Sequence, residues 1–329
     1  VLRTVVSHLE AINLNKTDLD VKGVAFEQFM DGFFKGDFGQ YFTPRPIIEF
    51  CVKMMKPEQD WDVLDPSCGS GGFLLHALDY MRKQAGDYYE KGTVDYFNYW
   101  HDFAAKHLYG IEINDEIARV AKMNMIVHDD GHTNVISHDA LDSIDKMHDH
   151  NKCFAQDHFD LILTNPPFGS TINKSEKPYL ATYELGNTVD AKGKNKPRKN
   201  QSSEVLFIER IWQFLKPGTG KAAIVLPDGI LTNSSMQYVR DFILEKFQLL
   251  AVVSLPQCAF AHFGAGVKAS IIFVRKRSGN EKADVNEAIF MAAPELIGYD
   301  ATGRKTESQL DEIIEKYEEF QKDATPFFV

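Results

Sequence analysis

The sequence predicts an α/β protein built on a doubly wound, mostly parallel sheet. Seven apolar runs typical of buried strands occur near residues 62–65, 108–113, 134–137, 159–164, 221–226, 250–255 and 269–275. Stretches with helical character separate most of these runs, and strands that alternate with helices indicate parallel pairing. A short Gly-rich loop joins the last two runs. We therefore expect a seven-stranded sheet that ends in an antiparallel hairpin.

Helices are predicted from apolar spacing and from the residues that begin them. Helical character is expected in 1–38, from Pro46 towards Met55, and in 80–106, 203–215 and 306–321. The sequence TESQ at 306–309 has the spacing of a capping box, which predicts where the C-terminal helix starts. The chain begins at Val1 and helical character is expected from there, as in a fragment of a longer protein with a larger helical N-terminal domain.

The motif Asn165-Pro166-Pro167-Phe168 follows the strand expected at 159–164. Two prolines cannot continue a sheet ladder or enter a helix interior, so the strand must stop there. A stiff turn then holds an amide and an aromatic ring at the carboxyl end of a strand, where open α/β sheets bind their ligands. Asn165 and a neighbouring main-chain carbonyl can accept both hydrogens of a planar amine, while Phe168 stacks on its ring. A plain strand-ending turn is the alternative.

A Gly-rich turn follows the first expected strand, in the sequence DPSCGSGGF at 65–73. Glycines there let the main chain pass close to a ligand near a helix N-terminus. The dinucleotide fingerprint GxGxxG is incomplete, because Leu74 occupies the third glycine position. The strand at 108–113 carries Glu112 near its end. The three strand ends together are far more specific than the glycines alone.

These residues resemble the class I S-adenosylmethionine-dependent methyltransferases that methylate amino groups of DNA. The sequence GQYFTPR at 39–45, followed by DPSCGSGGF and NPPF, is similar to the modification subunit of type I restriction–modification systems. The resemblance runs from about Asp20 to the C-terminus. It implies a methyltransferase domain over 39–329, preceded by the helical segment 1–38. It also implies transfer of a methyl group from S-adenosylmethionine to the N6 amino group of a flipped adenine.

The resemblance assigns the cofactor site to particular residues. It implies that the cofactor contacts Gln40, Tyr41, Phe42, Thr43, Asp65, Ser67, Gly69, Ser70, Gly71, Glu112, Asp139, Ala140 and Asn165. Glu112 is expected to accept hydrogen bonds from both ribose hydroxyls. Asp139 is expected to accept the amino hydrogen of the cofactor's adenine, with Ala140 or Leu141 beside the ring, although a helix N-cap explains Asp139 equally well. Tyr41 and Phe42 could equally be packing residues.

The resemblance also implies residues that act on the target base and on DNA. Asn165 and the Pro166 carbonyl would accept the two amino hydrogens, and Phe168 and Phe263 would flank the base. A polar stretch at about 170–203 is predicted to be a basic loop that orders on DNA. Five positive residues cluster within it, at Lys192, Lys194, Lys196, Arg198 and Lys199. A solvated flexible loop is the alternative.

Composition is that of a globular protein, with 44% hydrophobic and 25% charged residues among 329. The formal charge of −11 argues against a stand-alone DNA binder, because phosphate neutralisation supplies most non-specific affinity. We therefore expect a partner chain to supply basic surface for DNA, and the resemblance implies that the partners are a specificity subunit, a second copy of the chain and a restriction subunit. The four cysteines lack paired spacing, which favours a reduced, cytoplasmic protein. No membrane segment and no metal site are expected.

Two alternatives remain open at the level of sequence. An enzyme with the same Asn-Pro-Pro-aromatic geometry could methylate a glutamine side chain in a protein or a guanine in RNA. A catalytically silent subunit could keep the fold as a scaffold. A survey of methyl acceptors separates the first alternative, and a failure to bind cofactor would favour the second.

Overall fold

The computed structural model describes residues 43–128, 134–189, 194–261 and 266–327, and the predicted N-terminal helical segment 1–38 lies outside them. Eight strands of this part of the chain form one sheet, in the order β12-β10-β11-β9-β4-β1-β2-β3. They are β1 (Val63–Asp65), β2 (Leu108–Glu112), β3 (Val135–Ser137), β4 (Leu161–Thr164), β9 (Lys221–Pro227), β10 (Phe247–Ser254), β11 (Ala269–Lys276) and β12 (Phe290–Ala292).

Strand direction within this sheet is mostly parallel, as predicted. β9, β4, β1, β2 and β3 pair in parallel, and β11 lies antiparallel between β9 and β10. The prediction of seven strands is wrong, because β12 pairs in parallel with β10 and extends the sheet. The antiparallel pair β10–β11 is therefore not the last part of the sheet.

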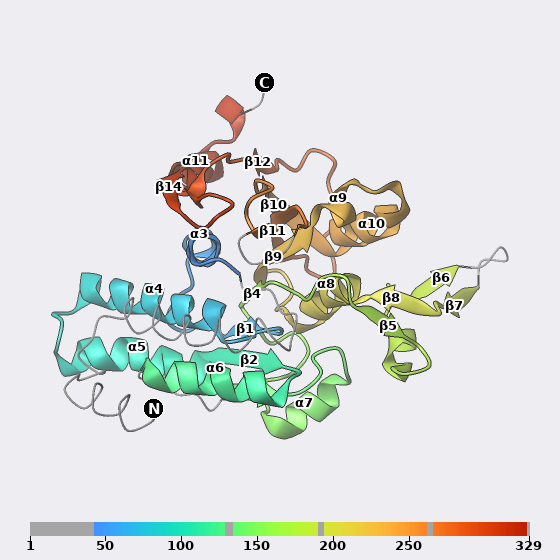
Figure 1. Cartoon of the computed structure of the whole chain (residues 1–329), viewed down its shortest axis with the longest axis horizontal. Coiled ribbons are helices and arrows are strands. Elements are labelled where there is room, and N and C mark those ends of the chain that lie inside the picture. Colours follow the sequence, from blue (N-terminus) through green and yellow to red (C-terminus); the bar gives the residue numbers. More distant parts are fainter. Residues whose placement is uncertain (1–42, 129–133, 190–193, 262–265, 328–329) are drawn as a thin grey trace.

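Helices cover both faces of the sheet (Figure 1). They are α3 (Arg45–Met55), α4 (Gly72–Tyr88), α5 (Val94–His107), α6 (Asp115–Val127), α7 (Ile144–His150), α8 (Ser203–Phe214), α9 (Asp228–Thr232), α10 (Gln237–Lys246) and α11 (Leu310–Lys322). One apolar core joins one face of the sheet to α3, α4, α5 and α11, and a second joins the other face to α8 and α10. Neighbouring strand residues therefore belong to different cores: Leu161 and Leu163 to the first, Ile162 to the second.

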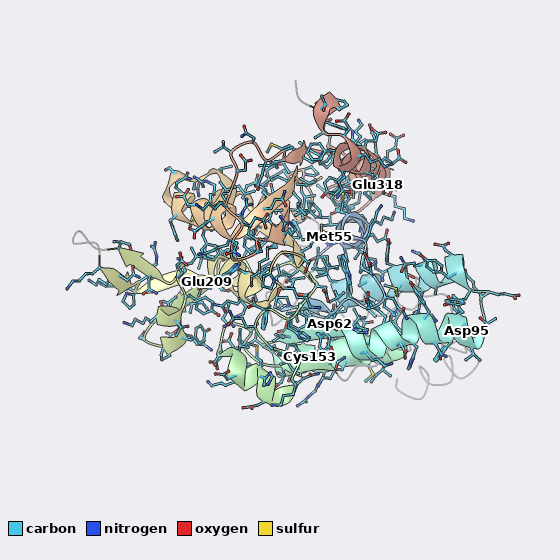
Figure 2. The ribbon with its side chains drawn as sticks, turned by 180° about the vertical axis from the view of Figure 1, so that it is seen from behind. Met55, Asp62, Asp95, Cys153, Glu209 and Glu318 are labelled. Carbon is cyan, nitrogen blue, oxygen red and sulfur yellow. The ribbon has the colours of Figure 1, made fainter. Side chains whose placement is uncertain are left out.

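The stretch predicted as a basic loop is instead a folded arm, which we define as residues 170–189 and 194–202. It contains β5 (Thr171–Asn173), the 3₁₀ helix η3 (Pro178–Thr182), β6 (Asn187–Val189), β7 (Asn195–Pro197) and β8 (Asn200–Ser202). β5 pairs with β8 and β6 with β7, both antiparallel, and the arm projects from the body of the molecule (Figure 1). Glu209 of α8 lies at its base (Figure 2), where its carboxylate accepts the Glu184 and Leu185 N–H groups, each at 2.8 Å.

The predicted capping box does not form. Residues 306–308 belong to β14 (Lys305–Ser308), which pairs with β13 (Ile297–Tyr299), so the helix starts at Leu310. Gln309 occupies the N-cap, but its side-chain oxygen accepts the N–H groups of Glu295 and Leu296, at 2.8 and 3.0 Å. Strand pairing with a distant segment has outweighed the local capping signal. No helix within the described ranges is both long and apolar enough to cross a membrane.

Candidate functional site

Four polar residues lie in a row at the carboxyl edge of the parallel strands. Asn165 follows β4, Asp65 ends β1, Glu112 ends β2, and Asp139 comes two residues after β3. The strand order β4-β1-β2-β3 places their carboxyl ends side by side, over three strand spacings or about 14 Å. The structure therefore brings these predicted site residues to one edge, where doubly wound sheets bind ligands.

The Gly-rich turn closes onto the end of β2. The Cys68 N–H donates to the Ile111 carbonyl at 2.9 Å, and the Gly69 N–H donates to Glu112 Oε2 at 3.1 Å. The other carboxylate oxygen, Oε1, accepts the Asn114 N–H at 2.9 Å. Gly69 has φ +52°, a conformation that favours glycine, and a Cβ built on it would meet no described atom within 4 Å. The turn thus fixes the 5% exposed Glu112 carboxylate and leaves open space beside its own backbone.

Asp65 is held by groups from two strands. Its Oδ1 accepts the Thr164 hydroxyl at 2.8 Å and the Ser67 N–H at 3.0 Å. Burial raises the pKa of Asp65 to about 7, the two hydrogen bonds oppose this rise, and the nearby Glu112 carboxylate adds to it. The Ser67 hydroxyl lies 2.7 Å from Thr164 Oγ1 and 3.3 Å from the Asn165 carbonyl oxygen. These contacts tie the Gly-rich turn to the Asn-Pro-Pro-Phe motif.

The Asn165 side-chain amide has a hydrogen-bond partner at its nitrogen and none, among the described residues, at its oxygen. Its Nδ2 donates to Thr43 Oγ1 at 2.9 Å, whereas its Oδ1 is buried and accepts no hydrogen bond from any described residue. A buried amide oxygen without a donor is costly, typically by about 1–3 kcal/mol, so it marks a place where a ligand donor fits.

The rest of the Asn-Pro-Pro-Phe motif is held by its neighbours. Ser203, the first residue of α8, donates its hydroxyl to the Pro167 carbonyl at 2.9 Å. Pro166 is buried, and the half-buried Phe168 packs against the first core. The motif is therefore a rigid turn and not a mobile loop end.

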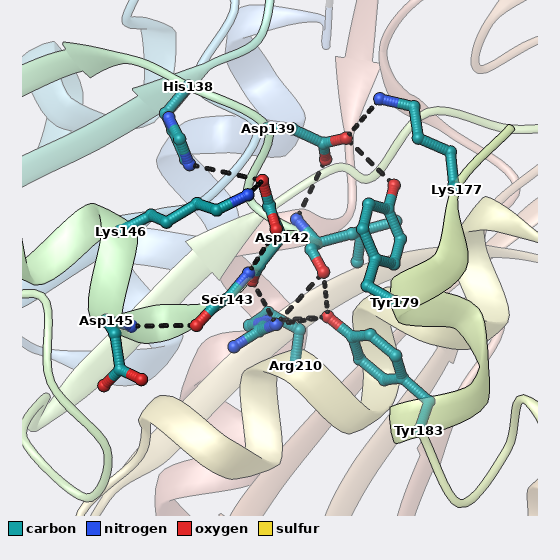
Figure 3. A network of polar contacts seen from close by, with 11 residues as sticks. His138, Asp139, Asp142, Ser143, Asp145, Lys146, Lys177, Tyr179, Tyr183 and Arg210 are labelled. Atoms are coloured by element: carbon teal, nitrogen blue, oxygen red, sulfur yellow. Dashed lines mark hydrogen bonds and ion pairs between the residues drawn. The ribbon is translucent and has the colours of Figure 1, made fainter.

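Asp139 is bonded to the arm (Figure 3). Its Oδ2 accepts the Lys177 ammonium and the Tyr179 hydroxyl, both at 2.9 Å, and its Oδ1 accepts the Leu141 N–H at 3.0 Å. Asp139 is not a helix N-cap, because Ser143 caps the next helix, α7. Ala140 beside it is buried.

Two further polar contacts bear on the predicted residues. The Ser70 carbonyl accepts the Asn124 amide at 2.9 Å, which supports the Gly-rich turn from α6, and Gly71 caps α4 at φ +88°.

The described basic residues predicted to contact DNA lie in the arm, where Lys194, Lys196 and Lys199 are exposed. Arg198 instead lies 4.3 Å over the Tyr238 ring and donates to the Asn187 carbonyl at 3.0 Å, so it anchors β7 and β8 to the body.

Some predicted positions fall outside the described residues. They are Gln40, Tyr41, Phe42, Lys192 and Phe263. Within the described ranges, no three metal-ligating side chains gather in a geometry that would hold a metal ion. The four cysteines are free thiols.

Sequence reasoning missed four residues that shape the site. Thr164 and Ser203 fix the Asp65 carboxylate and the proline turn, and Lys177 and Tyr179 bind Asp139. Thr164 could have been noticed in the sequence, because it is a polar residue in an otherwise apolar strand, and the structure shows that it is fully buried. The other three sit in polar sequence without a pattern that links them to the strand ends.

A family model described as N-6 DNA Methylase matches residues 17–328. Among curated relatives, the EcoEI type I restriction enzyme methylase subunit of Escherichia coli is 29% identical over 284 residues, which are 84% of this chain and 50% of that subunit. The StySPI methylase subunit of Salmonella potsdam is 30% identical over 256 residues, with 77% and 43% covered. This chain thus spans about half the length of those two relatives.

A solved structure supports the fold independently. The type I restriction-modification system methyltransferase subunit from Streptococcus thermophilus superposes with a TM-score of 0.68 at 22% identity, covering 96% of this chain and 61% of that one. The sheet order, with one antiparallel strand inserted beside β9, is the class I S-adenosylmethionine-dependent methyltransferase fold. Since the family model covers nearly the whole sequence, the chain belongs to the N-6 DNA methylase family.

Proposed function

We propose that this chain transfers the methyl group of S-adenosylmethionine to the N6 amino group of an adenine in DNA, as the methyltransferase part of a type I modification subunit. The observation that carries the proposal is the buried Asn165 Oδ1, which has no donor among the described residues and lies in the row with Asp65, Glu112 and Asp139. An amino group of a base would supply the missing donor.

The donor and acceptor set suits this cofactor. Glu112 presents a carboxylate at the end of β2, held by the Gly69 and Asn114 N–H groups, and a carboxylate is the acceptor that a ribose diol requires. The buried Asp65 carboxyl group and the open space at Gly69 offer an acceptor and room for the methionine end, bordered by Thr43, Ser67, Ser70 and Gly71. When bound, S-adenosylmethionine supplies an activated methyl group.

The residues of the proline turn prepare the acceptor amine. The target base must leave the duplex to reach the site. Asn165 Oδ1 and the Pro166 carbonyl accept its two amino hydrogens, which aims the nitrogen lone pair and stabilises the positive charge that develops there. Because Thr43 and Ser203 fix the turn, the acceptors are in place before the base arrives. Phe168 stacks on one face of the base and Phe263 lines the other side.

Partners supply what this acidic chain lacks. Lys194, Lys196 and Lys199 on the exposed arm, together with Lys192, contact phosphates, whereas Arg198 acts through the arm's anchoring. The net charge of −11 leaves sequence reading and most of the basic surface to a specificity subunit, a second copy of the chain and a restriction subunit.

The first test is calorimetric titration of S-adenosylmethionine into wild type, Glu112→Ala and, as a matched control, the exposed helix residue variant Glu116→Ala. We expect wild type and the control to bind and Glu112→Ala to lose at least tenfold in affinity, as for a lost hydrogen bond to a charged group. A folded wild type that binds no cofactor would favour the scaffold alternative.

The second test is a survey of methyl acceptors. With a specificity partner present, duplex DNA should accept the methyl group on adenine, and Asn165→Ala should lower the rate by about 10²–10³. Methylation of RNA guanine or of a protein glutamine, but not of DNA, would overturn the DNA assignment.

A further inference from the structure

Described donors occupy most of the hydrogen-bond acceptor positions of the Asp139 carboxylate (Figure 3). Oδ2 accepts two hydrogen bonds, from Lys177 and Tyr179, and Oδ1 accepts one, from the Leu141 N–H. A carboxylate oxygen has two lone pairs, so among the described contacts only one acceptor direction, on Oδ1, is free. A ligand donor at this strand end would therefore meet an oxygen whose orientation three protein donors have already set.

The Tyr179 phenol is held in its protonated, donating form. Burial raises the pKa of Tyr179, and the negative charge of Asp139 raises it further, so the phenol keeps its proton and donates it. The Lys177 ammonium forms an ion pair with Asp139 Oδ2, and the side chains of Lys177 and Asp139 are partly shielded from water. These contacts are charge-assisted hydrogen bonds, which are stronger and more directional than neutral ones.

Both donors come from the arm and not from the methyltransferase core. Tyr179 belongs to η3 and Lys177 directly precedes it. The next residue after η3, Tyr183, donates to the Leu141 carbonyl at 2.7 Å. Arg210 of α8 donates to the Tyr183 hydroxyl at 2.9 Å and to the Asp142 carbonyl at 2.7 Å. The segment 139–142 is thus clamped between the base of the arm and α8.

We infer that Lys177 and Tyr179 are positioning residues of the cofactor's adenine subsite: they orient Asp139 so that its remaining Oδ1 lone pair accepts the adenine amino hydrogen. This inference rests on the proposed function and extends it. It makes the base of the arm a part of the cofactor site. The selectivity of this site for an amino group then depends on side chains about 40 residues away in the sequence.

The test compares two ligands that differ at the adenine amino group. S-Adenosylhomocysteine carries the amino group, and S-inosylhomocysteine carries a carbonyl oxygen there. Calorimetry on the full chain gives the ratio of their dissociation constants for wild type, Lys177→Met, Tyr179→Phe and Lys177→Arg. Lys174→Met is the matched control, because Lys174 is an exposed lysine of the same arm.

We expect wild type and Lys174→Met to prefer the amino ligand by roughly 10- to 150-fold, the range for one hydrogen bond to a charged group. Lys177→Met and Tyr179→Phe should each reduce this preference at least fivefold, and Lys177→Arg should restore most of it. A merely structural role would weaken both ligands equally and leave the ratio unchanged. Circular dichroism of each variant confirms that it is folded.

Two results would overturn the inference, and they differ from a failure of the proposed function. One is a wild type that binds both ligands equally, because Asp139 would then not read the amino group. The other is a Tyr179→Phe variant and a Lys177→Met variant that discriminate as well as Lys174→Met does. A wild type that binds neither ligand would reject the proposed function itself.

Discussion

Replacing Asp65 by Asn tests whether burial keeps this carboxyl group protonated up to near-neutral pH. The side chain is 2% exposed, and burial raises its pKa from 3.8 to about 7 despite the hydrogen bonds from Thr164 and Ser67. Asparagine keeps an oxygen that can accept both bonds, but it carries no charge at any pH. The substitution therefore removes the buried ionisation and preserves most of the local geometry.

The sign of the effect follows from proton linkage. Between about pH 4 and about pH 7 the native Asp65 holds a proton that the unfolded chain has released, so the stability of wild type falls as the pH rises. A pKa difference of this size corresponds to about 4 kcal/mol. We expect on the order of 2–4 kcal/mol, because water and side chains relax around a buried charge. The Asp65→Asn variant has no group to ionise at this position, so it does not lose this stability. Its free energy of unfolding relative to wild type should therefore rise between about pH 4 and about pH 7 and stay constant above that.

The assay is urea unfolding without cofactor at several pH values from 2 to 8, followed by circular dichroism. Asp62, which precedes the same strand (Figure 2), provides a control of opposite sign. Burial would raise the pKa of Asp62, but hydrogen bonds from His107 and His158 outweigh it and lower the pKa to about 2. Asp62→Asn should therefore lose about 1–2 kcal/mol above pH 4, a loss that disappears as the pH falls towards 2. A stability difference between Asp65→Asn and wild type that does not change from pH 4 to pH 8 would refute the reasoning.

Three further predictions concern buried groups. Gly110→Ala would place a Cβ 3.0 Å from Cys68 Sγ, so the free energy of unfolding should fall by about 1–3 kcal/mol. The control is Gly279→Ala, where a Cβ meets no described atom within 4 Å and the loss should stay below about 0.5 kcal/mol. Arg210→Met removes the side-chain donor to the Asp142 carbonyl and to the Tyr183 hydroxyl at a buried position and should cost about 2–4 kcal/mol; an unchanged midpoint would contradict this. Burial raises the pKa of both Cys51 and Cys68, so neither should react with a thiol reagent at pH 8 before unfolding.

Local sequence patterns predicted the parts of this protein that local forces decide. Apolar runs identified seven of the eight strands that the described chain contributes to the main sheet, and proline and glycine marked where β4 and β1 must end. The order of strands and helices then implied the edge at which Asp65, Glu112, Asp139 and Asn165 meet. These features depend on periodicity and backbone restriction, which are properties of neighbouring residues.

Tertiary structure decided the pairings between distant segments. Three features depend on pairing with a segment that local sequence patterns do not identify. They are the eighth strand β12, the paired strands of the arm and the loss of the capping box at 306–309. The same is true of the hydrogen bond from Asn165 to Thr43, and of those from Lys177 and Tyr179 to Asp139. Spacing could place Asn165 and Asp139 near strand ends, but it did not point to Lys177 or Tyr179. Only three-dimensional packing determines which buried acceptors already have a donor and which, like Asn165 Oδ1, still lack one within the described chain.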